Sequence, residues 1–140
     1  MIFRKKAVLL TFTFLMFMLF SSTSLANSIT PYESDIFDSY SISFSSNKVA
    51  TFSCDLSRKV SSVKVSKCTI QKKVWNTFTK KYEWNNEKTL SNVCSATDSK
   101  YLSGSKDLSS YIGSGTYRVH ATFIADGESK PITSTERTFK

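Results

Sequence analysis

The stretch Tyr117-Arg118-Val119-His120-Ala121-Thr122-Phe123 alternates apolar and polar side chains without a break. An alternation of period two places successive side chains on opposite faces of the backbone. This is typical of a β-strand with one buried and one solvated face. We therefore predict a central strand here, with Tyr117 and Phe123 among the side chains that point into the core.

Apolar residues outside this strand also recur with period two rather than 3.6, and Ser and Thr are abundant. Strands are predicted at residues 36–44, 49–54, 63–75, 82–93 and 131–139, with a mixed segment at 101–112. Short strands without intervening helices favour antiparallel sheets, because parallel strands need long crossover connections. The expected fold is all-β, an antiparallel immunoglobulin-like β-sandwich of about seven strands. A Greek-key barrel is the alternative.

Local signals refine this outline. The apolar phase slips by one residue within 63–75, which predicts a β-bulge near Ser66-Lys67. Residues 55–62 are expected to form a loop and residues 76–81 a hairpin loop. Asp126-Gly127 has the chemistry of a tight hairpin turn.

Residues 1–26 have the three parts of a secretory signal peptide. Arg4-Lys5-Lys6 forms a basic start, an apolar run of 14 residues follows at 7–20, and Ser24-Leu25-Ala26 supplies the small residues that signal peptidase requires. The run is shorter than the roughly 20 residues of a membrane span. We predict a signal-peptide helix that is removed by cleavage.

The predicted mature chain begins at Asn27. It consists of a lead segment, residues 27–37, and one β-sandwich domain, residues 38–140, a length that suits a single core. We expect it to be secreted and extracellular, with no stable membrane insertion after cleavage.

The mature chain holds sixteen basic and eleven acidic side chains, a net charge of +5. The excess lies between residues 48 and 118, where there are thirteen Lys or Arg and five Asp or Glu. A basic surface attracts polyanions such as teichoic acids, anionic lipid or nucleic acid. It also serves simply to keep a protein soluble, so both interpretations stay open here.

Three segments, taken in order, resemble a known family. They are residues 49–54 (VATFSC), residues 69–73 (TIQKK) with the hairpin of Trp75 and Trp84, and residues 115–119 (GTYRV). Together they resemble a family of small secreted proteins of Gram-positive bacteria that is described as a domain of unknown function. The resemblance covers roughly residues 42–138 and implies secretion and an immunoglobulin-like sandwich. It implies no activity and no active site.

The mature chain has three cysteines, Cys54, Cys68 and Cys94. Secretion permits disulfides, and three thiols allow at most one internal bridge. If the hairpin turns near Thr79, Cys68 and Cys94 lie two or three residues from being opposite, which makes them the candidate pair and leaves Cys54 as a buried thiol. Cys54–Cys68 is the alternative. The family pattern does not include Cys68 and Cys94.

No pattern predicts catalysis, a metal or a cofactor. His120, the single histidine, is expected to point away from the core, and no nucleophile motif accompanies it. The cysteine spacings do not fit a zinc site. Glu83 and Glu87 would lie about 13 Å apart along a strand that rises ~3.3 Å per residue, which is too wide for a glycosidase pair. We predict that the protein is not an enzyme.

The segment 72–88 is the strongest candidate for binding, because basic and aromatic side chains interleave there. The candidate surface comprises Lys72, Lys73, Trp75, Phe78, Lys80, Lys81, Tyr82, Trp84 and Lys88. Such side chains bind nucleic acid strands, lipid headgroups or sugar rings. They also stabilise hairpins across strands and protect a sheet edge from aggregation.

These observations predict a small secreted, non-catalytic binding or interaction module at the cell envelope. Its expected partner is an anionic cell-wall polymer or glycan, or a protein, with no specific nucleic acid and no cofactor. The alternative is a secreted effector, such as a toxin, inhibitor or immunity-type factor, that acts on another protein or cell.

Overall fold

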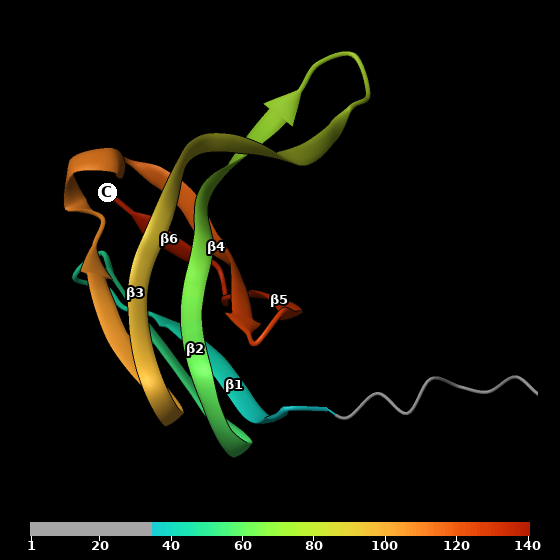
Figure 1. The fold of residues 1–140 in the computed structure, drawn as a ribbon. Helices are drawn as coiled ribbons and strands as arrows, with labels where there is room; N and C mark the ends of the chain where they lie inside the picture. Colours follow the sequence, from blue (N-terminus) through green and yellow to red (C-terminus); the bar gives the residue numbers. More distant parts are fainter. Residues whose placement is uncertain (1–34) are drawn as a thin grey trace, which may run out of the picture. The chain divides into compact units, whose positions relative to one another are not determined.

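A computed structural model describes residues 35–140 as six strands and one 3-10 helix (Figure 1). The elements are β1 (Phe37–Phe44), β2 (Val49–Asn76), β3 (Lys81–Asp107), η1 (Ser109–Tyr111), β4 (Gly115–Ala125), β5 (Glu128–Thr133) and β6 (Arg137–Phe139). All strand pairs are antiparallel, which confirms the all-β prediction. The predicted signal peptide and most of the predicted lead segment lie outside the described residues. Within residues 35–140, no helix is long and apolar enough to cross a membrane.

Strand β4 is the central strand that the alternation predicts. Tyr117, Val119, Ala121 and Phe123 are buried, and the residues between them are partly exposed. β2 pairs with one edge of β4, and β5 and β6 pair with the other. The polar face of β4 is therefore the outer face of a sheet whose inner face forms the core.

The lengths of β2 and β3 differ from the prediction. β2 continues through the predicted loop at 55–62, and β3 continues beyond Val93 to Asp107. Pairing between the two strands is interrupted between Asp55 and Val60 and resumes on both sides. Residues 55–62 suggested a loop because most of their side chains are polar and exposed on the outside of a bend. The backbone nevertheless stays extended, and Leu56 and Val60 point into the core.

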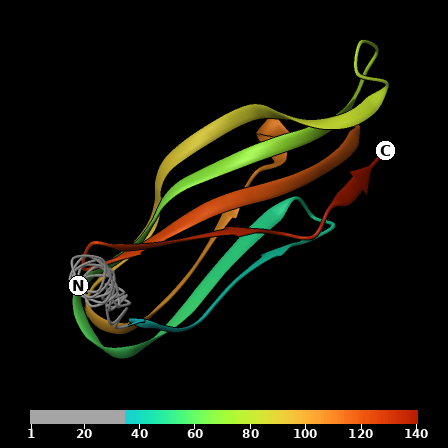
Figure 2. The ribbon, with the colours of Figure 1, turned by 90° about the vertical axis from the view of Figure 1, so that its right-hand side faces the viewer.

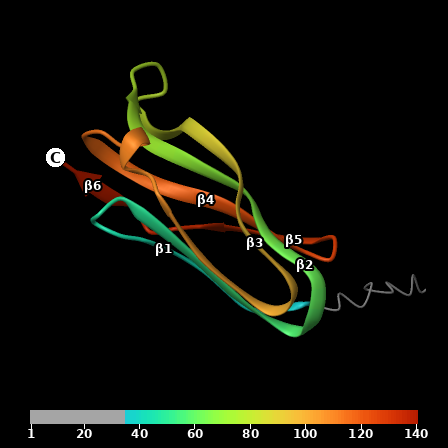
Figure 3. The ribbon, with the colours of Figure 1, turned by 60° about the vertical axis from the view of Figure 1, so that its left-hand side comes forward.

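This bend divides the sheet into two layers that face each other (Figures 2 and 3). The first half of β2 lies between β1 and the second half of β3, and the second half of β2 lies between β4 and the first half of β3. Tyr40 of β1 contacts Phe123 of β4 across the layers, with ring centroids 6.2 Å apart. The two layers enclose one apolar core.

Gly104 shows how closely the layers approach. A Cβ atom at this position would lie 2.7 Å from the Cβ of Cys94, which belongs to the facing half of the same strand. Real Cβ atoms do not come this close, so a side chain at 104 would push the two halves of β3 apart. Glycine is required here for packing.

The C-terminal strand is also divided. We predicted one strand over residues 131–139, whereas β5 and β6 pair with different parts of β4 and are separated at Ser134. The Ser134 hydroxyl accepts a hydrogen bond from the Val119 backbone N–H and donates one to the Thr135 carbonyl. These bonds turn the chain, so that one predicted strand becomes two. The total is six strands rather than about seven, because β2 and β3 each run through both layers.

The predicted irregularities lie where the sequence places them. The β2 register shifts between Val65 and Lys67 against both neighbouring strands, which confirms the bulge. Asp126 and Gly127 form the β4–β5 turn with φ values of 44° and 90°, as a two-residue hairpin turn requires. The hairpin loop after Asn76 is confirmed as well.

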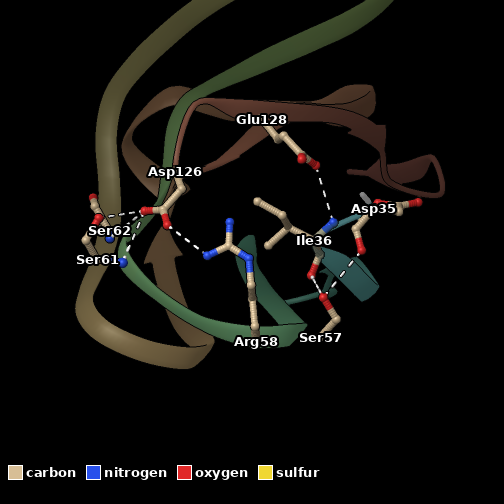
Figure 4. Close-up of polar contacts among 8 residues, drawn as sticks. All are labelled: Asp35, Ile36, Ser57, Arg58, Ser61, Ser62, Asp126 and Glu128. Carbon is tan, nitrogen blue, oxygen red and sulfur yellow. Dashed lines mark hydrogen bonds and ion pairs between the residues drawn. The ribbon is translucent and has the colours of Figure 1, made fainter. Parts of the chain in front are cut away.

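Side chains hold the bend to its neighbours (Figure 4). The Asp126 carboxylate accepts hydrogen bonds from the Ser61 hydroxyl at 2.7 Å, the Ser61 N–H at 3.1 Å and the Ser62 N–H at 3.3 Å. Arg58 lies 3.5 Å from its second oxygen. Glu128 accepts a hydrogen bond from the Ile36 N–H. The β4–β5 turn is thus fastened to the bend of β2.

Candidate functional site

The β2–β3 hairpin extends beyond the rest of the sheet (Figure 1). The last β2–β4 pair is Lys72 with Tyr117, whereas β2 and β3 remain paired with each other as far as Asn76 and Lys81. We call residues 73–84 the hairpin arm. It comprises seven of the nine predicted binding residues together with their connecting turn.

The nine predicted binding residues do not form one face. Lys73 pairs with Trp84, and Trp75 pairs with Tyr82, so these four side chains share one face of the arm. The Lys72 ammonium lies on the opposite face, 5.5 Å from the centre of the Tyr117 ring. The sequence analysis treated these residues as one surface, whereas the structure distributes them over two faces of the hairpin.

The remaining predicted residues lie elsewhere on the hairpin. Phe78 and Lys80 belong to the turn, and Lys81 pairs with Asn76 beside it. The Lys88 ammonium lies 5.9 Å from the centre of the Tyr111 ring. These lysines therefore surround the base and the tip of the arm.

Cations and rings follow one another along the shared face. Arg118 lies 4.2 Å from the centre of the Trp84 ring, and the Lys73 ammonium lies 5.6 Å from it. Lys73 also lies 5.8 Å from the Tyr82 ring and 3.2 Å from Glu136. Trp84 and Lys73 are thus engaged within the protein. Trp75 and Tyr82 pack edge to face at 5.1 Å and remain 51% and 64% exposed, so they are the rings that a ligand can reach.

The turn at the tip is ordered by side-chain hydrogen bonds. The side-chain amide oxygen of Asn76 accepts hydrogen bonds from the backbone N–H groups of Phe78 and Thr79. Asn76 and Thr79 in turn donate to the Glu83 carboxylate at 2.8 and 2.7 Å. These bonds lower the pKa of Glu83, that from Asn76 being the larger cause. The turn holds Phe78 outward, with 96% of its surface exposed.

The fold adds basic residues that sequence reasoning did not include. We call the part of the molecule around the arm, residues 44–49, 72–88, 106–118 and 136–140, the hairpin end. Its basic side chains are Lys48, Lys72, Lys73, Lys80, Lys81, Lys88, Lys106, Arg118, Arg137 and Lys140, and its acidic ones are Glu83, Glu87, Asp107 and Glu136. Lys48 and Arg137 come from the β1–β2 turn and from β6. Nothing local in the sequence connects them with the hairpin.

Most of these cations lack an acidic partner. Within residues 35–140, Lys73 is the one cation of the hairpin end that lies within 4.0 Å of a carboxylate side chain. Lys48 donates to the Ile112 carbonyl, and Arg137 donates to the Phe44 carbonyl. Neutral acceptors leave the positive charge uncompensated, so this end of the molecule presents a basic surface.

The three cysteines are free thiols in the structure. The predicted Cys68–Cys94 bridge is absent because Leu90 lies opposite Cys68, and Val65 lies opposite Cys94. The alternative Cys54–Cys68 bridge is absent as well. Burial raises the pKa of the Cys68 thiol to about 12, so it stays protonated at neutral pH and packs as a small apolar side chain.

The residues weighed for catalysis have structural partners. The His120 ring lies on the outer face of β4, where its Nδ1 lies 2.8 Å from the Thr133 hydroxyl. Within residues 35–140, no group of three His, Cys, Asp or Glu side chains is arranged to hold a metal ion. A surface hollow of about 520 Å³ lies beside Lys59 and residues 95–103, and no predicted binding residue lines it.

No family model, no curated protein and no solved structure matches this chain. The resemblance to small secreted Gram-positive proteins therefore stays a prediction.

Proposed function

We propose that the protein is a secreted, non-catalytic binding module that attaches to an anionic polymer of the cell envelope through its hairpin end. In this proposal its two-layered fold is a sandwich of the immunoglobulin-like type, and it carries the binding surface at one end. The observation that carries the proposal is the uneven compensation of charge along the molecule.

The opposite end supports this interpretation. We call residues 35–38, 55–62, 98–101 and 126–130 the bend end. Three of its four basic side chains lie close to carboxylates: Arg58 to Asp126, Lys59 to Asp98 and Lys130 to Asp35, at 3.5, 2.9 and 3.4 Å. If lysines served only for solubility, there would be no reason for one end to be compensated and the other not.

The cations of the hairpin end surround the arm rather than forming a cleft. Lys80, Lys81 and Lys88 are exposed, and Lys48 and Arg137 lie at its base. A polymer with repeated negative charges can contact several of them at once, whereas a small anion would need a closed site. The expected ligand is therefore an extended polyanion, such as an anionic wall polymer or a charged glycan.

The test is cosedimentation of the mature chain with purified anionic wall polymer at low and high salt. The key variant replaces Lys80, Lys81 and Lys88 with Ser. At about 1 kcal/mol for each lysine near an anionic surface, the variant should bind roughly a hundredfold more weakly at low salt. Binding of the unmodified chain should fall as salt rises, because surface charges are screened over about 8–10 Å at physiological ionic strength.

A matched control replaces three lysines outside the hairpin end, Lys64, Lys67 and Lys100, with Ser. It lowers the net charge by the same amount and should bind nearly as well as the unmodified chain. Equal losses in the two variants would mean that net charge, and not the hairpin end, governs binding. Absence of binding by the unmodified chain at low salt would refute the proposed function.

A further inference from the structure

We infer that the hairpin arm is a lipid-docking element, and that its occupant is the headgroup region of an anionic lipid bilayer. The inference goes beyond the proposed function, since it gives the hairpin end a second anionic surface, a lipid bilayer, to bind. It concerns reversible docking of the tip, with the rest of the molecule outside the bilayer.

Phe78 is presented to solvent at the tip of the arm. Its side chain is 96% exposed and makes no ring contact within residues 35–140. The turn that carries it is held by Asn76, Thr79 and Glu83, so the exposure belongs to an ordered conformation. A large apolar side chain presented in this way gains free energy when a partner removes it from water.

The exposed rings of the arm lie at two levels, one at the tip and two behind it. Phe78 stands at the tip, and the exposed rings of Trp75 and Tyr82 follow it. Tryptophan and tyrosine favour the boundary between the hydrocarbon and the headgroups, where the ring is partly dry and its polar atom is wet. Phenylalanine lacks a polar atom and suits the deeper position.

Lysine side chains lie next to the apolar tip. Lys80 and Lys81 lie in and beside the turn, and neither has a carboxylate partner within residues 35–140. If the tip entered the headgroup layer, their long side chains would reach the lipid phosphates while their stems stayed near apolar groups. Lys48, Lys88 and Arg137, farther back at the base of the arm, would face the negatively charged surface.

Binding to a polyanion uses the lysines of the hairpin end but leaves the apolar tip of the arm without a partner. Phosphate groups along a polymer would contact the lysines but would leave Phe78 in water. A glycan needs an open ring face to stack on, and Trp75 and Tyr82 already pack edge to face on each other. An anionic bilayer uses the apolar tip, the aromatic rings and the surrounding lysines together.

The experiment is cosedimentation of the mature chain with two kinds of vesicle. One is phosphatidylcholine alone, and the other contains equal parts of phosphatidylcholine and phosphatidylglycerol. Soluble glycerol phosphate and purified wall polymer are tested in separate experiments. We expect binding to the anionic vesicles, little binding to the neutral ones, and no competition from glycerol phosphate, which offers the headgroup chemistry without an interface.

The variants separate the tip from the charges. Phe78→Ser should weaken binding to anionic vesicles at least about tenfold, while Phe78→Trp should retain it. The matched control is Tyr101→Ser, which removes another exposed ring, 65% exposed, at the bend end, and should change binding less than about twofold. Because Phe78 supports no packing, thermal melting of the Ser variant should match that of the unmodified chain.

A direct readout of depth uses vesicles with brominated acyl chains, which quench tryptophan fluorescence on contact. The Phe78→Trp variant should be quenched more strongly than the unmodified chain, whose tryptophans lie behind the tip. Equal quenching, or equal vesicle binding by the unmodified chain and Phe78→Ser, would overturn the lipid-docking inference.

The same measurements also distinguish the lipid-docking inference from the proposed function. If the unmodified chain binds wall polymer in a lysine-dependent way but does not bind vesicles, the proposed function stands and the inference fails. If Phe78→Ser loses polymer and vesicle binding equally, the tip is not specific for lipid, and the inference fails again. If neither surface is bound, both fail.

Discussion

The two ends of the molecule differ in how far their charged side chains are compensated by opposite charges. At the bend end, carboxylates lie beside cations and accept backbone hydrogen bonds, as Asp126 does from Ser61 and Ser62. At the hairpin end, cations outnumber carboxylates, and several of the cations lie over aromatic rings or donate to carbonyl groups. The first arrangement fastens the β4–β5 turn to the bend, and the second leaves charge and apolar surface exposed.

The ion pairs of the bend end are not there mainly for stability. They are partly or fully open to solvent, and surface pairs contribute about 0–1 kcal/mol each. Their consequence is electrostatic, because they cancel charge at one end and leave the molecule with a basic pole. A partner with negative charge would therefore approach the hairpin end first.

The largest difference between the two ends should appear in stability when a core residue of the bend is truncated. Leu56 is fully buried where β2 begins to turn. Leu56→Ala should lower the free energy of unfolding by about 2–5 kcal/mol, because it leaves a cavity between the layers. Urea denaturation of both proteins measures this. A loss below about 1 kcal/mol would show that the bend is not part of the cooperative core.

A smaller and pH-dependent effect is expected from Asp126→Asn. Hydrogen bonding to the Ser61 hydroxyl, with contributions from the Ser62 N–H and the charge of Arg58, lowers the pKa of Asp126. A lowered pKa means that the ionised form stabilises the fold above the unfolded-state pKa of ~3.9, and that this contribution disappears as the pH falls.

Asp126→Asn should therefore melt at a lower temperature than the unmodified chain at pH 6. The difference between the two melting temperatures should shrink as the pH falls below about 4, where the carboxylate becomes protonated. Asparagine tolerates the positive φ of this position, so the substitution tests the charge rather than the backbone. A difference that stays constant with pH would contradict the role of the carboxylate in holding the bend.

Truncation of an aromatic ring on the arm should affect stability less than truncation at the bend. Trp75→Ala removes the edge-to-face contact with Tyr82 but opens no cavity in the core. Cross-strand aromatic pairs contribute about 0.2–1 kcal/mol, and the loss should lie in that range in the same urea experiment. A loss as large as that of Leu56→Ala would mean that the arm belongs to the core rather than standing outside it.

The smallest effect on stability is expected from replacing Lys80, Lys81 and Lys88 with Ser. Substitutions of exposed residues outside special structural features usually change stability by within about 0.5 kcal/mol. The melting temperature should stay close to that of the unmodified chain, even where polymer binding is lost. Clear destabilisation would turn these lysines into structural residues and remove the contrast between the ends.

Local patterns in the sequence were sufficient for some parts of the fold. The alternation at 117–123, the phase slip near Ser66-Lys67 and the turn at Asp126-Gly127 each depend on neighbouring residues, and each was predicted. The continuation of β2 through 55–62 was not, because an extended chain on the outside of a bend carries the same polar side chains as a loop. Such a segment can be recognised only from the strands that pair on both sides of it.

The candidate site shows the same limit. Residues 72–88 were identified because basic and aromatic residues are concentrated there, but assigning their faces required the register of the hairpin. Lys72 and Lys73 are neighbours in sequence and point to opposite faces. Lys48 and Arg137 join the basic surface through contacts between strands far apart in the chain, which composition alone does not reveal.

The continuous pairing of β2 with β3 also has a consequence for the order of folding. Their register runs from Asn76 opposite Lys81 to Val49 opposite Asp107. One hairpin with a single turn therefore contributes strands to both layers. Closing a short loop is far faster than joining distant segments, and each pair that forms next to the turn shortens the search for the following one. We therefore expect the hairpin to assemble first at Asn76–Lys81 and to proceed along its length, with β1 and β4 joining afterwards. The segment that we propose meets the partner would then also be the place where folding begins.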